Sequence, residues 1–209
     1  MSRIAYVNGR YVPHREAAVH VEDRGYQFAD AVYEVVHVHD GRFVDEEPHL
    51  DRLERSLREI RIPMPMPRTA LQRVLREVVR RNRIAEGIVY FQISRGVARR
   101  DHAFPARPVL PALVVTAKRL KPFPTRIEGW KATAITHPDQ RWARCDIKTV
   151  GLLPNVLARQ AAVEKGATFV LMPVSCRRQL VDLSDDMATR VNILLYTDAR
   201  EALIKAIGE

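Results

Sequence analysis

Residues 141–160 read RWARCDIKTVGLLPNVLARQ and carry Lys148 near their centre. The chain has 34 Lys plus Arg, of which only six are Lys, so each retained lysine invites an explanation. Arginine does not lose its proton, whereas a neutral lysine amine can condense with a carbonyl group to form a Schiff base. Ile147 precedes Lys148, and Leu152 and Leu153 follow it, and an apolar setting favours the neutral amine. The residues alone leave two interpretations open, a nucleophilic amine at Lys148 and a solvated surface cation, and the composition by itself favours the surface cation.

The composition is that of a globular domain. At 209 residues the chain is long enough for one large or two small domains, and 46% apolar with 28% charged residues is ordinary. No apolar run reaches the roughly 20 residues that span a bilayer, and the first ten residues lack the apolar segment of a signal peptide. Cys145 and Cys176 are too few for a disulfide framework, so we expect a cytoplasmic protein without membrane partners. The net charge of +9 is dispersed rather than clustered, which favours anionic small molecules over nucleic acid as partners.

The hydrophobic pattern alternates between strand and helix periodicity, with turn signals at Asn8-Gly9 and Asp40-Gly41. The two prolines of KPFPTR, residues 121–126, mark the best domain boundary. We predict an α+β domain over 1–120 and a second domain over 121–209. The expected strands are 3–7, 10–12, 31–39, 42–44, 88–94, 109–117, 130–136 and 168–172, and the expected helices are 48–60, 69–83 and 153–165.

The run RWARCDIKTVGLLPNVLARQAAVEKGA, residues 141–167, resembles the catalytic-lysine segment of the D-amino acid aminotransferases. These enzymes belong to the fold-type IV group that depends on pyridoxal 5'-phosphate (PLP), with the branched-chain aminotransferases and the aminodeoxychorismate lyases. The resemblance implies a two-domain fold of mixed α+β and α/β character. It also implies that Lys148 binds PLP covalently and moves the proton during transamination.

Residues 95–105, RGVARRDHAFP, resemble the RGxxxRxHxFP loop of the same enzymes. The resemblance implies that Arg100 and His102 bind the substrate α-carboxylate together with Tyr33 of the motif VYE. Arginine can offer two parallel hydrogen bonds to a carboxylate, so the proposed role is chemically sound. The resemblance further implies that this loop serves the partner's site in a homodimer. A solvated basic loop is the alternative.

Residues 49–53, HLDRL, resemble the helix whose arginine binds the PLP phosphate, which implies that role for Arg52. Helical spacing points Arg52 away from the apolar stripe, so a surface arginine is the alternative. Glu34 and the run Asp23-Arg24-Gly25 also match the family, and we expect them to be architectural. His37 and His39 share a strand face but show no third ligand in the sequence, so we predict no metal site.

The motif-level resemblance ends near Met172. The family continues with a TEGSSSN-like motif whose Glu pairs with the pyridine nitrogen, and that motif is absent here. Asp182 is the nearest carboxylate in order and is our candidate for this role. We therefore expect an incomplete second domain and impaired transamination of a D-alanine-type amino acid with a 2-oxo acid such as 2-oxoglutarate. The alternatives are a branched-chain aminotransferase, an aminodeoxychorismate lyase or an inactive dimeric remnant.

Overall fold

The computed structural model describes residues 3–121, 133–136, 146–167 and 169–171. Its backbone packs into two compact units. The first unit takes residues 1–122 and also Ile147–Gly151, so the segment around Lys148 packs with the N-terminal part of the chain. The second unit takes 123–146 and 152–209. The domain boundary at residue 120 remains a prediction.

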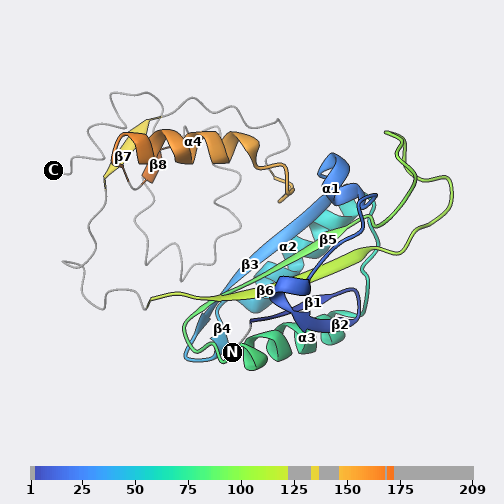
Figure 1. The fold of residues 1–209 in the computed structure, drawn as a ribbon, viewed down its shortest axis with the longest axis horizontal. Helices are drawn as coiled ribbons and strands as arrows, with labels where there is room; N and C mark the ends of the chain where they lie inside the picture. The colour runs from blue at the N-terminus through green and yellow to red at the C-terminus, as the bar shows by residue number, and fades with distance from the viewer. Residues whose placement is uncertain (1–2, 122–132, 137–145, 168, 172–209) are drawn as a thin grey trace. The chain divides into compact units, whose positions relative to one another are not determined.

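The first unit is built on a six-stranded sheet in which all neighbours are antiparallel, with the order β2-β1-β6-β5-β3-β4 (Figure 1). Left-handed backbone at Asn8 and Gly9 makes the turn between β1 and β2, and Asp40 and Gly41 do the same between β3 and β4, as the turn signals predicted. Short 3-10 helix η1 (His14–Glu16) follows β2. The strands are β1 (Ile4–Val7), β2 (Arg10–Pro13), β3 (Ala31–His39), β4 (Arg42–Phe43), β5 (Gly87–Ser94) and β6 (Ala112–Arg119).

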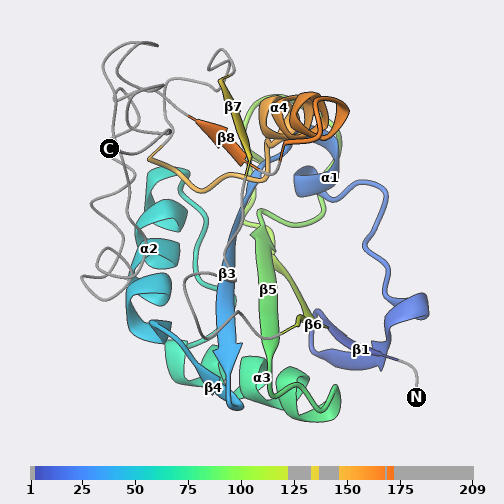
Figure 2. The same cartoon turned by 90° about the vertical axis from the view of Figure 1, so that its left-hand side faces the viewer.

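Two amphipathic helices, α2 (Glu46–Glu59) and α3 (Arg68–Arg81), cover one face of this sheet (Figure 2). The predicted stripe of α2 is buried, and α3 buries its own stripe at 3.6-residue spacing. Short helix α1 (Arg24–Phe28), which the sequence pattern did not predict, lies just before β3. The helix side chains buried against the sheet are Leu50, Leu53, Leu57, Leu71, Leu75, Val78 and Val79.

Successive residues of β3 alternate between two environments, because side chains in a strand point to opposite faces. Val32, Glu34, Val36 and Val38 are fully buried on the helix-covered face. The intervening residues are half-buried or exposed, and they are Tyr33, Val35, His37 and His39. We call the face that these four residues share the second face of the sheet.

The described part of the second unit is a βαβ arrangement. β7 (Ala134–Thr136) pairs in parallel with β8 (Phe169–Leu171), and α4 (Leu153–Glu164) connects them in the chain. Pro154 occupies the first turn of α4, and Gly166, with φ of +66°, follows its end, as predicted. None of the helices within the described residues is long and apolar enough to cross a membrane.

Candidate active site

Lys148 is placed by backbone pairing with the start of β3. The Tyr33 amide donates to the Lys148 carbonyl at 3.1 Å, and the Val150 amide donates to the Ala31 carbonyl at 3.3 Å. Thr149 forms an antiparallel bridge with Val32 between these two hydrogen bonds. The segment therefore behaves as a short extra strand, and this pairing fixes Lys148 beside Tyr33.

The Lys148 amine contacts the aromatic side chain of Tyr33. Its Nζ lies 3.4 Å from the Tyr33 hydroxyl and 4.5 Å from the centre of the Tyr33 ring. The hydroxyl contact is long for a hydrogen bond, and the position over the ring adds a cation–π attraction while the amine is charged. Ile147, the residue before Lys148 in the predicted apolar patch, is buried in the core. The Tyr33 ring adds an apolar surface that the sequence analysis did not place beside Lys148.

Tyr33 is supported by a second tyrosine on β5. The rings of Tyr33 and Tyr90 stack with their centres 5.5 Å apart, and the Tyr90 hydroxyl donates to Gln92 Oε1 at 2.7 Å. Burial, with a smaller contribution from Tyr33, raises the pKa of Tyr90 to about 12, so Tyr90 keeps its proton at neutral pH. No motif pointed to Tyr90. Strand alternation could have found it, because Tyr90 is the β5 partner of Val35 and thus shares the second face with Tyr33.

Arg100 and His102 come together on the ring of Phe28, at the end of α1. The Arg100 guanidinium lies 5.1 Å from the ring centre, and the His102 ring lies 5.4 Å from it. Both side chains are exposed, so they are accessible to an anionic ligand. Phe28 is followed by Ala29, whose carbonyl accepts a 3.4 Å hydrogen bond from the Thr149 hydroxyl. The Arg100–His102 pair and the Lys148–Tyr33 pair therefore approach the same end of β3.

Buried ion pairs hold this loop in place, through Arg24, which we expected to be architectural, and through Asp30 and Arg95, to which the sequence analysis gave no role. Arg24 and Arg95 both bind the Asp30 carboxylate, at 2.8 and 2.7 Å. Arg24 also donates to the carbonyls of Asp101 and His102. Burial raises the pKa of Asp30, but hydrogen bonds from Arg95 and then Arg24 outweigh burial and leave its pKa below the ordinary value. The loop that carries Arg100 is thus tied to the start of β3.

A glycine is required where the loop begins. Gly96 has φ of +101°, and a Cβ there would lie 2.0 Å from the carbonyl oxygen of Leu110. The expected architectural role of Asp23-Arg24-Gly25 is confirmed: Asp23 caps α1 by accepting from the Gly25 amide, and all three residues are buried.

Arg52 lies on α2 and pairs with Glu34 of β3. Its Nε and Nη2 donate to the two carboxylate oxygens, each at 2.7 Å, and His49 Nδ1 lies 2.8 Å from Glu34 Oε2. Glu34 is fully buried, which confirms its architectural role. Burial raises the pKa of Glu34, but hydrogen bonds from Arg52 and then His49 outweigh burial and leave its pKa below the ordinary value. Phosphate binding by Arg52 stays a prediction, and Asp182 lies outside the described residues.

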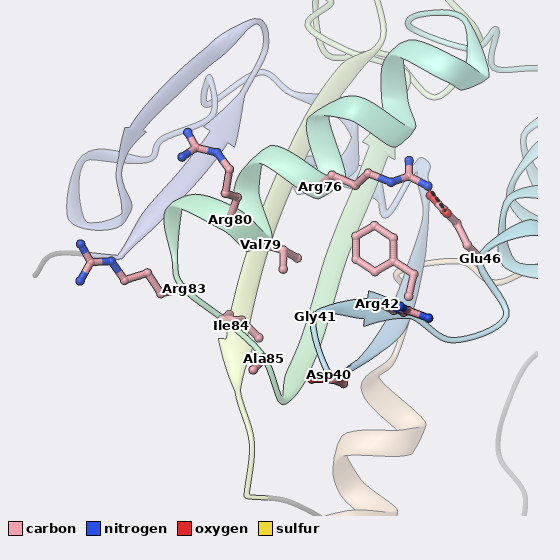
Figure 3. A pocket seen from close by; sticks show the side chains of 11 residues that line it. Asp40, Gly41, Arg42, Glu46, Arg76, Val79, Arg80, Arg83, Ile84 and Ala85 are labelled. Atoms are coloured by element: carbon pink, nitrogen blue, oxygen red, sulfur yellow. Dashed lines mark hydrogen bonds and ion pairs between the residues drawn. The ribbon is translucent and has the colours of Figure 1, made fainter.

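A cavity of about 630 Å³ lies at the opposite end of β3 from Lys148 (Figure 3). Phe43, Val79 and Ile84 contribute apolar side chains, and Arg76 pairs with Glu46 at 2.6 Å across one side. In Figure 3 the side chains of Arg80 and Arg83 extend away from the apolar residues. None of the residues predicted for the active site lines this cavity. Its remaining lining residues are Asp40, Gly41, Arg42 and Ala85.

The chain is similar to known proteins both in sequence and in fold. The chain is 38% identical over 205 residues to a D-alanine aminotransferase of Listeria monocytogenes serotype 1/2a (strain 10403S), covering 95% of this chain and 68% of that protein. Its fold matches the branched-chain amino acid aminotransferase of Escherichia coli with a TM-score of 0.74 at 18% identity, over 97% of this chain and 80% of that one. It also matches an aminotransferase of Mycobacterium tuberculosis in a PLP-bound form, with a TM-score of 0.63 at 23% identity, over 81% of this chain and 61% of that one.

The structural matches define the fold as that of the fold-type IV aminotransferases. Residues 31–180 match the model of the family amino-transferase class IV, and the chain belongs to this family. The cofactor of the family is PLP. The matched range includes Tyr33, Arg52, Arg100, His102 and Lys148, although the match does not test their individual roles.

Proposed function

We propose that this chain is a PLP-dependent aminotransferase that transfers the amino group of a D-amino acid of the D-alanine type to a 2-oxo acid. The observation that carries the proposal is the contact of the Lys148 amine with Tyr33 at the start of β3. The 38% identity to a D-alanine aminotransferase supports the D-amino acid over a branched-chain substrate, because the branched-chain enzyme shares only the fold.

The residues around Lys148 fit the cofactor of the family. Across residues 3–121 and 146–167, the Lys148 amine bonds to Tyr33 and forms no ion pair with a carboxylate. Covalent attachment of PLP needs a lysine amine that can condense with an aldehyde, and among these residues no carboxylate has to be displaced from Lys148 first. When bound, PLP supplies an electron sink that stabilises negative charge at the substrate Cα.

The side chains of the protein transfer the proton and bind the substrate and the cofactor. The Lys148 amine would accept the proton from the substrate Cα and give it up again later in the same half-reaction, and its flexible four-carbon side chain allows this movement. Arg100 and His102 bind the substrate carboxylate, with Tyr33 as a further donor. We propose that Arg52 binds the cofactor phosphate and that Asp182 faces the ring nitrogen. The exposed position of Arg100 and His102 supports a loop that serves the partner's site in a homodimer, and we propose the cytoplasm as its compartment.

Borohydride labelling tests the proposal directly. The purified chain is incubated with PLP, reduced with borohydride and digested, and the labelled peptide is identified by mass spectrometry. We expect the label on Lys148 and none in Lys148→Ala, while Lys165→Ala, a variant of an exposed lysine at the end of α4, labels normally. D-alanine and L-leucine are then compared as amino donors. Labelling at another lysine, or faster turnover of L-leucine, would refute the corresponding part of the proposal.

A further inference from the structure

Three potential metal ligands converge on the second face of the sheet, away from Lys148. His37 and His39 lie two residues apart on β3, and Glu86 directly precedes β5. Because Val38 pairs with Gly87, Glu86 is brought opposite His39 across the two strands. One ligand atom from each of the three side chains lies within 4.8 Å of the others. The third ligand that the sequence lacked therefore comes from the neighbouring strand, 47 residues away.

The carboxylate is already oriented toward the histidines. Glu86 Oε1 accepts a hydrogen bond from the Asp40 amide at 3.0 Å, and His39 Nδ1 lies 3.1 Å from the same oxygen and 3.2 Å from Oε2. A backbone donor that holds one oxygen of a ligating carboxylate orients it and limits its motion. The His39 side chain is 71% exposed and that of Glu86 is 26% exposed, so an ion from solvent can reach them.

The spacing suits a small transition-metal ion. Zinc lies about 2.0–2.2 Å from nitrogen and carboxylate oxygen ligands, so two ligand atoms of a tetrahedral site are about 3.4 Å apart. His39 is exposed, and His37 and Glu86 are partly buried, so small side-chain rotations can close the present spacing to that value. Two imidazole nitrogens and one carboxylate oxygen favour Zn²⁺, Co²⁺, Ni²⁺ or Cu²⁺ over the oxygen-seeking Mg²⁺ and Ca²⁺.

We propose that His37, His39 and Glu86 bind one divalent transition-metal ion, with water at the remaining positions. The ion links the end of β3 to the start of β5 and so stabilises the turn at Asp40-Gly41. The competing interpretation is an ordinary ion pair between His39 and Glu86 at the surface. The two differ in what His37 contributes, since only metal binding needs all three side chains.

Titration with Co²⁺ and Zn²⁺ separates the two interpretations. The tag-free full chain is titrated calorimetrically with each ion, and the Co²⁺ complex is also followed by visible absorption. We expect one equivalent to bind, with weaker binding in His37→Asn, His39→Asn and Glu86→Gln. Loss of a residue that only orients a ligand weakens metal binding about 10–100-fold, so loss of a ligand should cost at least as much. The control is His20→Asn, which removes an exposed histidine far from the cluster and should bind like the parent chain.

Thermal unfolding provides a second measurement that does not depend on calorimetric heats. Zn²⁺ should raise the melting temperature of the parent chain and of His20→Asn but not of His37→Asn, because an ion bound only to the folded state stabilises it. Equal binding by His37→Asn and the parent chain would overturn the proposal. A Co²⁺ spectrum with sulfur-to-metal charge-transfer bands would do the same, since it would place the ion on cysteine.

Discussion

Tyr33 and Glu34 are neighbours in β3, yet their surroundings differ in almost every respect. Glu34 is fully buried under α2, and its two oxygens are bound by Arg52 and His49. Tyr33 lies half-buried on the second face, where it meets Tyr90 and the Lys148 amine. A charge removed from water needs an oppositely charged or hydrogen-bonding partner, whereas a nucleophilic amine must be able to react with its substrate. Strand β3 thus carries a structural ion pair, Glu34 with Arg52, on its helix-covered face and the tyrosine that contacts the Lys148 amine on its second face.

Replacing Glu34 removes the ion pair between β3 and α2 on the helix-covered face, and we expect this change to lower the stability most. Glu34→Ala leaves Arg52 and His49 facing a buried void, and loss of one partner of a buried ion pair costs about 3–5 kcal/mol. Urea unfolding should show this loss in the midpoint. The matched control on the second face is Lys148→Ala, which should change the free energy of unfolding by no more than about 0.5 kcal/mol. Equal stability of the two variants would mean that the Glu34 pair is not structural.

Arg100→Ala should weaken substrate binding and leave the stability of the fold nearly unchanged. Loss of a hydrogen bond to a charged group costs about 1.5–3 kcal/mol, which corresponds to a rise in KM for the amino acid of about 10–150-fold. The control is Arg99→Ala, which removes an equally exposed neighbouring charge and tests simple electrostatic attraction. Steady-state kinetics with D-alanine measures both. A similar rise in the two variants would indicate a diffuse effect of positive charge and not a specific carboxylate site.

Strand β3 was readable in the sequence as a β-rich run, but its buried face was not, because apolar residues occur on both faces and a charged residue, Glu34, is buried among the valines. The helix stripes and both left-handed turns were equally readable, and the structure confirms them. What remained hidden depends on strand pairing over long sequence distances. The contact of Lys148 with Tyr33 spans 115 residues, and that of Ser94 with Asp23 spans 71. Local propensity carries no information about such register. The resemblance gave Tyr33 and Lys148 separate roles, and their contact is visible only in the structure.

Strand β6 shows a smaller error of the same kind. Its sequence pattern predicted a strand from residue 109, but the strand begins at Ala112. Pro111 has no amide hydrogen to offer a neighbouring strand, and Leu110 is 89% exposed, with its carbonyl packed against Gly96. The apolar residues of 109–111 therefore belong to the loop that carries Arg100, and not to the sheet.

Acid should break the ion pairs that Asp30 forms with Arg24 and Arg95. The folded pKa of Asp30 lies below its ordinary value, so its pairing with Arg24 and Arg95 stabilises the folded state above about pH 4 and is lost as the pH falls below that. Asp30→Asn should lower stability at pH 7 by about 1–3 kcal/mol and lose less on acidification than the parent chain. Urea unfolding from pH 6 to pH 3 measures the slope. Parallel slopes would show that other carboxylates cause the acid sensitivity.

The smallest expected change in stability comes from Tyr90, which contacts Tyr33 on the second face but has no contact with Lys148 among those seen in the described residues. Tyr90→Phe removes the hydroxyl that donates to Gln92 but keeps the ring that stacks on Tyr33, so stability should fall by only about 0.5–1.5 kcal/mol. Because burial raises the pKa of Tyr90 to about 12, its hydroxyl stays protonated through the working range. An ultraviolet titration should therefore show the same tyrosinate signal below about pH 11 in Tyr90→Phe and in the parent chain.

The pH dependence of D-alanine turnover should distinguish the role of Tyr33 from that of Tyr90. Tyr33→Phe removes the hydroxyl that contacts the Lys148 amine and should change the pH dependence of D-alanine turnover, because that amine must lose its proton to react. Tyr90→Phe leaves the contact intact and should leave the pH profile unchanged. If Tyr90→Phe shifted the pH profile and Tyr33→Phe did not, the protonation of the Lys148 amine would depend on Tyr90 as well as on Tyr33. The direct contact between Lys148 and Tyr33 would then not explain the pH dependence of turnover.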